Sequence, residues 1–294
     1  MVIKPLSVVV QEEESGAEQV PSENKPYRFS LAGVQLKFSA LAESASGLTI
    51  PASGVGGDWI VKLPAQNFAH VPENEWAMLD LARQIGIPVP ETRLLDLSEI
   101  VRLPDVGVLS GNKALAVKRF DRIEGRRIHI EDFAQVYGLF PKDKYGKVSY
   151  ANIANMVWSL TGEKGLVDFI QRLVFTIMIG NGDMHLKNWS LLYADGRTAE
   201  LAPAYDFVAT VPYIPQDKLA LNLSGSKDMQ AISLQHFKKL SAKAQLPEFI
   251  TLKTVRETVA AVRDVWSQLK SDYPLPGAIL SRIDQHMGSV KPDA

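Results

Sequence analysis

The sequence contains no cysteine, which excludes disulfide bonds, thiolate catalysis and metal sites built from cysteine ligands. It also lacks any uninterrupted apolar run of about 18 residues, the length that a membrane-spanning helix needs. The first residues form only a short apolar stretch followed by three glutamates, unlike a secretory signal. We therefore expect a soluble, cytoplasmic protein that has no membrane partner.

An excess of charge of either sign is also missing. The chain has 32 Lys+Arg and 33 Asp+Glu, a net charge of −1, so its surface as a whole has no electrostatic reason to bind nucleic acid. A local basic patch is one interpretation of four arginines, and a solvated face is the one we favour: Arg119, Arg122, Arg126 and Arg127. The five histidines, at positions 70, 129, 185, 236 and 286, lack the spacing of metal ligands.

A length of 294 residues is typical of two domains or two lobes. Residues 10–26 are polar and contain Pro, Gly and Ser, and we predict that residues 1–26 form a flexible amino-terminal segment. Residues 27–120 alternate in strand fashion around one helix and predict a β-rich N-lobe. Residues 121–294 hold apolar-faced helices and one hairpin, with Asp195-Gly196 as the turn signal, and predict a mostly helical C-lobe. The fold class is therefore α+β.

The N-lobe carries a lysine in an apolar context. Lys62 lies in the strand pattern "WIVKLP", where an ammonium is costly unless it meets anions, and phosphates and Glu75 of the next helix are its expected partners. The alternative is a lysine at a strand edge that points to water. The stretch Ser30–Lys37, "SLAGVQLK", could cover phosphates with its backbone N–H groups. Ser53–Asp58 is richer in glycine, but we interpret it as an exposed hairpin turn.

The C-lobe carries an acid and an amide at the spacing found in kinase catalytic loops. Asp183 and Asn188 form D-x-x-x-x-N after a buried helix, as in kinase-type catalytic loops. Such loops need a carboxylate for the proton of the acceptor hydroxyl and an amide oxygen for magnesium. Asp206 follows the hairpin and supplies a second hard oxygen. Each motif alone also fits a polar loop or a cap, but their order along the chain predicts a phosphoryl-transferring enzyme that uses ATP and Mg²⁺.

Several blocks of the sequence resemble the HipA family of bacterial Ser/Thr kinases, the toxins of toxin–antitoxin modules. They span roughly residues 28–210 and read "FSLAGVQLK", "WIVKLP", "ENEWAMLDLARQIGIPVPE", "VKRFDR", "IGNGDMHLKNWSLL" and "LAPAYDF". The resemblance implies a two-lobed protein-kinase-like fold, Asp183 as the catalytic residue, and Asn188 and Asp206 as magnesium ligands. It also implies an ATP site, with the adenine at the hinge strand around positions 118–120, formed by Ser30, Ala32, Gly33, Val34, Gln35, Lys37, Lys62, Glu75, Lys118, Phe120, His185 and Lys187. His185 is expected to orient the loop.

The resemblance further implies that the protein phosphorylates a host protein, by family analogy an aminoacyl-tRNA synthetase, and silences itself by autophosphorylation at Ser30. About 29 residues precede Ser30, so the chain resembles the short, HipT-like branch. Its antitoxin is then a small HipS-like protein, a HipB-like helix-turn-helix protein or both, and contact with DNA is only through the antitoxin. Arg28 stands where a second loop serine can occur, which leaves the number of regulatory phosphosites open.

Two other functions fit parts of this pattern. Small-molecule kinases of the aminoglycoside-phosphotransferase type also have loops that read G-D-x-H-x-x-x-N. A non-enzymatic scaffold that binds nucleotide and sequesters a DNA-binding partner is the second alternative. The motif "VKRFDR" and the loop serine favour the protein kinase over the first, and the retention of all four polar positions, 62, 183, 188 and 206, argues against the second.

Overall fold

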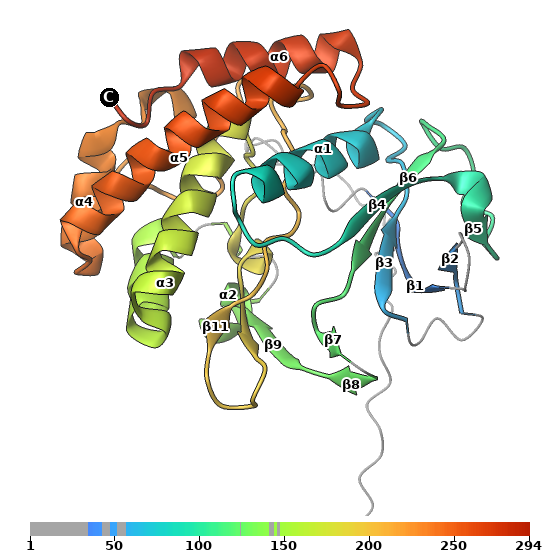
Figure 1. Cartoon of the computed structure of the whole chain (residues 1–294), viewed down its shortest axis with the longest axis horizontal. Helices are drawn as coiled ribbons and strands as arrows, with labels where there is room; N and C mark the ends of the chain where they lie inside the picture. The colour runs from blue at the N-terminus through green and yellow to red at the C-terminus, as the bar shows by residue number, and fades with distance from the viewer. Residues whose placement is uncertain (1–34, 43–47, 52–56, 124, 141–143, 146–147) are drawn as a thin grey trace, which may run out of the picture.

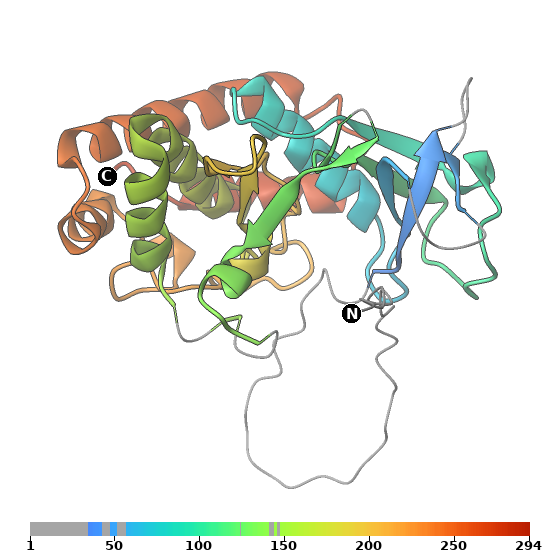
Figure 2. The ribbon, with the colours of Figure 1, turned by 90° about the horizontal axis from the view of Figure 1, so that it is seen from below.

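The computed structural model describes residues 35–42, 48–51, 57–123, 125–140, 144–145 and 148–294. A six-stranded sheet and a group of helices lie on opposite sides of the molecule, as Figures 1 and 2 show from two directions. The predicted α+β fold with a β-rich N-lobe and a helical C-lobe is thereby confirmed. The predicted flexible segment, residues 1–26, and the loop residues Ser30, Ala32, Gly33 and Val34 lie outside the described residues.

The N-lobe sheet has the strand order β4-β6-β3-β1-β2-β5 and is antiparallel except for the pair β2–β5. Lys62 of β3 pairs with Lys37 of β1, which places two lysines on neighbouring strands. On β6 the side chains alternate, so that Ala114 and Ala116 face one core and Leu115 faces α1. The strands are β1 (Lys37–Ala42), β2 (Leu48–Thr49), β3 (Trp59–Lys62), β4 (Thr92–Asp96), β5 (Ile100–Val101) and β6 (Lys113–Lys118).

Helix α1 (Val71–Gln84) connects the two lobes. A proline in its first turn suits the start of a helix, and Gly86, at φ 85°, follows its end as the sequence predicts. Figure 1 shows α1 running between the sheet and the helices α5 and α6. Its Trp76 meets Tyr273 edge to face at a centroid distance of 6.2 Å, and Tyr273 stacks on Trp266 of α5. The C-lobe therefore supports the outer side of this helix.

The C-lobe is organised around α3 (Tyr150–Ile179), which packs mainly against α5. The sequence predicts two helices here, "VSYANIANMVWSLT" and "GLVDFIQRLVFTIMIG", and the structure confirms a break between them, within the segment labelled α3, at Gly162. Its backbone, φ 65° and ψ −151°, is one that glycine adopts without strain. The other helices are α2 (Phe133–Val136), α4 (Leu234–Ala244), α5 (Glu248–Leu269) and α6 (Gly277–Ser289), with short 3-10 turns η2 (Leu97–Glu99), η4 (Leu186–Asn188) and η5 (Met229–Ala231). Within the described ranges, no helix combines the length and the apolarity needed to cross a bilayer.

A three-stranded sheet, β11-β10-β9, positions the loops of the C-lobe. The predicted hairpin is confirmed, because β10 pairs with β11 and the Asp195 carboxylate accepts the backbone N–H groups of Arg197 and Thr198 in the turn. Residues 180–189 therefore lie between the end of α3 and the start of β10, and Asp206 follows β11. The remaining strands are β7 (Arg122–Ile123), β8 (Arg126–Arg127), β9 (His129–Asp132), β10 (Ser190–Tyr193) and β11 (Glu200–Leu201).

Candidate active site

Lys62 occupies the centre of the site, where the two lobes meet. Its Nζ donates hydrogen bonds to Oε1 of Glu75 on α1 and to Oδ1 of Asp206, which follows β11. Lys62 is only 5% exposed, so the alternative of a lysine that points to water is wrong. A buried ammonium needs anionic partners, and here two elements distant in sequence supply one each. The contact ties β3, α1 and the C-lobe together at one nitrogen.

Lys62 and Asp206 stabilise each other's charged form, whereas burial and the Asp206 charge raise the pKa of Glu75. Burial lowers the pKa of Lys62, but the carboxylates of Asp206 and Glu75 outweigh it and raise the pKa above the usual range. Burial alone would raise the pKa of Asp206. Lys37, whose Nζ lies 3.7 Å from Asp206 Oδ2, and Lys62 hold that pKa below its usual range. At neutral pH the site therefore presents an ionised Asp206 carboxylate between two ammonium groups.

Asp206 has a left-handed backbone, with φ 56°. Its carbonyl oxygen accepts a hydrogen bond from Asn181 Nδ2 at 3.3 Å. Three residues further on, the peptide of Ala209 is held at both ends by Asn74, whose Nδ2 donates to the Ala209 carbonyl (2.9 Å) and whose Oδ1 accepts from the Ala209 N–H (3.0 Å). Asn74 is fully buried and precedes Glu75, so this pair fixes the register of α1 against the Asp206 segment.

The loop that follows α3 is folded tightly on itself. Asp183 N–H donates to Asn181 Oδ1 at 2.9 Å, and Asn188 Nδ2 donates to the Asp183 carbonyl at 2.9 Å. The Thr210 hydroxyl accepts the N–H of Gly182 at 2.8 Å and lies 2.5 Å from an Asp217 carboxylate oxygen. These bonds hold the Asp183 and Asn188 side chains of the predicted catalytic loop in one short segment.

His185 lies between the two acids of the site. Burial lowers its pKa to about 4, although the carboxylates of Asp183 and Asp206 act in the opposite direction. Because of this lowered pKa, His185 is a neutral imidazole at neutral pH. Its Nε2 is 3.9 Å from Asp183 Oδ1, which is too far for a hydrogen bond. His185 Nδ1 and Gln35 Nε2 are buried, and neither has a hydrogen-bond partner in the part of the chain that the structure describes. Buried polar atoms without partners are costly, which favours a ligand-binding role for this region.

A cavity of about 240 Å³ opens between the lobes next to Lys62. Its walls are apolar at Ile60, Val117 and Ile130, and cationic at Lys37 and Lys62. The rings of Phe120 and Tyr205 also line it, with their centroids 5.8 Å apart. A slot with apolar walls and cationic side chains suits a planar base joined to phosphates.

The structure brings most of the predicted site residues to this place. The cavity is lined by Lys37, Lys62, Lys118, Phe120 and Asp206. Glu75 reaches it through Lys62, and Asp183, His185 and Asn188 share the neighbouring loop. Lys187 does not line the cavity and is exposed; only its carbonyl takes part, by accepting from the Tyr205 hydroxyl at 2.9 Å.

Outside the predicted hinge at positions 118–120, sequence reasoning missed five residues of the cavity: Ile60, Val117, Asp121, Ile130 and Tyr205. The position of Tyr205 directly before Asp206 was an available signal. Ile130 has none, because β9 reaches the cavity only through the packing of the lobes. Of the four arginines considered as a basic patch, Arg119 and Arg122 bind the Asp121 carboxylate, and the other two are exposed on β8. Arg126 and Arg127 therefore agree with a solvated face, whereas Arg119 and Arg122 do not.

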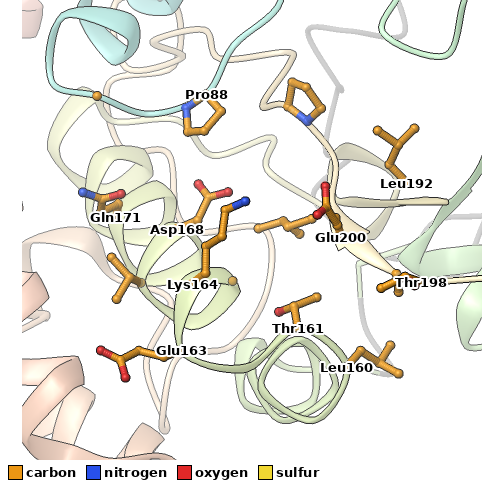
Figure 3. A pocket seen from close by; sticks show the side chains of 16 residues that line it. Pro88, Leu160, Thr161, Glu163, Lys164, Asp168, Gln171, Leu192, Thr198 and Glu200 are labelled. Carbon is orange, nitrogen blue, oxygen red and sulfur yellow. The ribbon is translucent and has the colours of Figure 1, made fainter. Parts of the chain in front are cut away.

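A larger hollow of about 840 Å³ lies away from this site, between the break in α3 and the β10–β11 hairpin. Figure 3 shows the side chains of Lys164, Asp168 and Glu200 around it. None of the predicted site residues lines it. Its most buried acid, Asp168, is neutralised by Arg172 at 2.7 Å, so we assign no chemistry to this hollow.

Clusters of three or more His, Cys, Asp or Glu side chains placed to hold a metal are absent from the described residues. The two residues that the sequence predicts as magnesium ligands, Asn188 and Asp206, are one amide and one carboxylate and do not form a cluster of that kind. Magnesium accepts such a set because it retains several of its own waters.

Comparison with known proteins places this site in context. A family model described as the HipA-like C-terminal domain matches residues 29–266. "Putative kinase Y4dM" of Sinorhizobium fredii is 50% identical over 93% of the chain, and the serine/threonine-protein kinase toxin HipA of Shewanella oneidensis is 26% identical over 71%. The chain spans 68% of the length of Y4dM and 50% of that of HipA.

Two solved structures share the fold. A Shewanella oneidensis complex of HipA, HipB and operator DNA aligns through its matched chain with a TM-score of 0.70 at 22% identity, and the match covers 91% of this chain and 64% of that one. The Helicobacter pylori proinflammatory kinase CtkA aligns with a TM-score of 0.55 at 13% identity, over 85% and 90% of the two chains. The first structure is named for a toxin–antitoxin system and the second for a kinase, and their likeness to this chain is one of fold.

Proposed function

Because the chain belongs to the HipA-like C-terminal domain family, we propose that it is an ATP- and magnesium-dependent serine/threonine protein kinase. The observation that carries this proposal is the buried Lys62 bonded to both Glu75 and Asp206. Protein kinases use such a lysine to hold phosphates and such an acid to hold magnesium.

The residues present fit this pair of ligands. Lys37 and Lys62 offer two cations where phosphates need them, and the apolar walls at Ile60, Val117 and Ile130 suit an adenine ring. Gln35, whose Nε2 has no hydrogen-bond partner among the described residues, lies two residues before Lys37. Magnesium would be held by Asn188 and Asp206, which are hard oxygen donors.

Each protein group then has a distinct task. Lys62, fixed by Glu75, holds the phosphates, and Asp183 accepts the proton of the acceptor hydroxyl. His185, neutral and buried, orients the loop between the two acids. Bound magnesium ATP supplies the phosphoryl group and the cation that neutralises its charge.

The Shewanella oneidensis HipA toxin occurs in a complex with HipB and operator DNA. We propose that this chain is likewise the toxin of a toxin–antitoxin pair, restrained by a HipB-like helix-turn-helix protein, a HipS-like protein or both. Its target is a host protein, an aminoacyl-tRNA synthetase by family analogy. Autophosphorylation at Ser30 would silence it, because a phosphoserine adds about −1.5 to −2 charges to a loop assigned to ATP's own phosphates.

The proposal is tested by incubating the purified protein with labelled ATP, magnesium and a bacterial lysate. We expect one discrete labelled protein, no labelling after chelation of magnesium, and none with Asp183→Ala. Asp105→Ala, which removes an exposed acid of the N-lobe, serves as the control and should label normally. Undiminished labelling with Asp183→Ala would disprove the assignment. Transfer of phosphate only to a small molecule such as an aminoglycoside would instead favour the small-molecule kinase.

A further inference from the structure

Tyr145, which precedes α3, contacts the predicted catalytic acid. Its hydroxyl donates a hydrogen bond to Asp183 Oδ1 at 2.7 Å. The two residues are 38 positions apart in the sequence, so this contact exists only because the chain returns to the loop at the end of α3. Tyr145 is half-buried.

The C-lobe holds Tyr145 in place from other directions as well. Its ring meets the imidazole of His185 edge to face, with a centroid distance of 5.1 Å and an interplanar angle of 73°. Its carbonyl oxygen accepts from Lys227 Nζ at 3.3 Å, and the same Nζ donates to the Ala220 carbonyl at 2.8 Å. The Lys144 ammonium lies 5.1 Å from the centre of the tyrosine ring. Because these contacts hold the ring and the backbone of Tyr145, its hydroxyl has a fixed direction toward Asp183.

A phenol that donates to one carboxylate oxygen restricts rotation of that carboxylate. This restriction matters for a base, which must present an oxygen in one direction to the incoming hydroxyl. Tyr145 itself does not need to touch the substrate to exert this effect.

We propose that Tyr145 is a positioning residue that orients the Asp183 carboxylate for proton transfer from the acceptor hydroxyl. The inference rests on the proposed phosphoryl transfer and deepens it by assigning a role that the catalytic-loop motif does not include. Because Tyr145 acts through Asp183, its removal should lower kcat and leave nucleotide binding unchanged.

The test is Tyr145→Phe, which removes one oxygen and keeps the ring on His185. We expect kcat to fall about ten-fold, because a positioned general base contributes roughly 10²–10⁴-fold to the rate and only its orientation is lost. The KM for ATP should not change. Tyr193→Phe is the matched control, because that hydroxyl also donates to a carboxylate, Glu131 Oε2 at 3.0 Å, on the β9–β10 strands. It should retain the wild-type kcat.

A double-mutant cycle separates action through Asp183 from a general structural effect. In an Asp183→Asn background, the further change Tyr145→Phe should alter the residual rate by less than about two-fold, because the group through which it acts is gone. Equal ten-fold losses in both backgrounds, or a loss of ATP affinity that accounts for the change, would overturn the inference.

Three other results would also overturn it: a wild-type kcat in Tyr145→Phe, a faster rate in that variant, or phosphate found on Tyr145 itself. The last two would mean that the hydroxyl occupies the place of the acceptor. An inactive wild-type protein would overturn the proposed function and this inference with it, whereas an active wild type with an unaffected Tyr145→Phe variant overturns only the inference.

Discussion

Asn74 offers a quantitative test of how the two lobes are coupled. The replacement Asn74→Leu keeps the approximate volume of the side chain and removes both hydrogen bonds to the Ala209 peptide. Asn74 is 0% exposed, so water cannot replace it. The Ala209 N–H and carbonyl would each lose a partner, at about 1–3 kcal/mol per buried group. The free energy of unfolding should therefore fall by about 2–6 kcal/mol, a large part of the roughly 5–15 kcal/mol typical of a domain.

Urea unfolding followed by circular dichroism measures this loss. Asn155→Leu is the control, since the exposed Asn155 makes a single bond, from Nδ2 to the Ala244 carbonyl at 2.9 Å, and its loss should cost about 1 kcal/mol. Calorimetric titration of the folded Asn74→Leu variant with a magnesium–ATP analogue should also show weakened binding, because Glu75 and Asp206 lose their common register. A loss of stability no greater than that of Asn155→Leu, together with full affinity for the analogue, would refute the coupling argument.

Three further changes have defined outcomes. Gly182→Ala would place a Cβ atom 2.0 Å from an Asp217 carboxylate oxygen and should lower the phosphoryl-transfer rate at least about ten-fold. Gly288→Ala is the control, because its Cβ meets nothing within 4 Å and the rate should not change. Equal rates in the two variants would contradict the geometry. Lys62→Met leaves two buried acids without their cation, so nucleotide binding should be lost and unfolding made easier by about 3–5 kcal/mol, as urea titration can check. Burial lowers the pKa of His286 below the usual 6.5, so the unfolded state takes up a proton first and stability should fall as the pH drops below that value. His286→Gln should flatten this dependence, and an unchanged pH slope would show that His286 is not its source.

The sequence predicts many of the local elements and the pairing of Lys62 with Glu75, because both follow from short-range patterns. Apolar spacing locates α1 and α5, and the cost of burying an ammonium predicts anionic partners for Lys62. The sequence also predicts two helices where α3 lies, although a glycine in a helical pattern is compatible with an interruption or with a continuous helix. The non-helical backbone of Gly162 confirms the interruption.

Contacts between distant segments could not be predicted. Asn74 and Ala209 are 135 residues apart, and their pairing depends on how α1 settles on the C-lobe. Tyr145 has no motif around it, and its importance appears only when its hydroxyl is seen on Asp183. Side-chain chemistry fixes what each residue needs, but the packing of whole elements decides which neighbour supplies it.

The aromatic support of α1 affects where this kinase-like unit ends. The family match stops at residue 266, yet Trp76 rests on Tyr273, whose hydroxyl also lies 3.4 Å from an Asp80 oxygen. A fragment cut at the family boundary would retain Lys62, Glu75 and every polar group of the catalytic loop. It would nevertheless lack Tyr273, so one side of α1 would lose its packing partner. Glu75 on α1 would then be held less firmly against Lys62, even with every strand and helix formed. The folded unit that supports the site therefore extends past residue 266. A protein truncated there would retain the predicted catalytic residues and still be inactive.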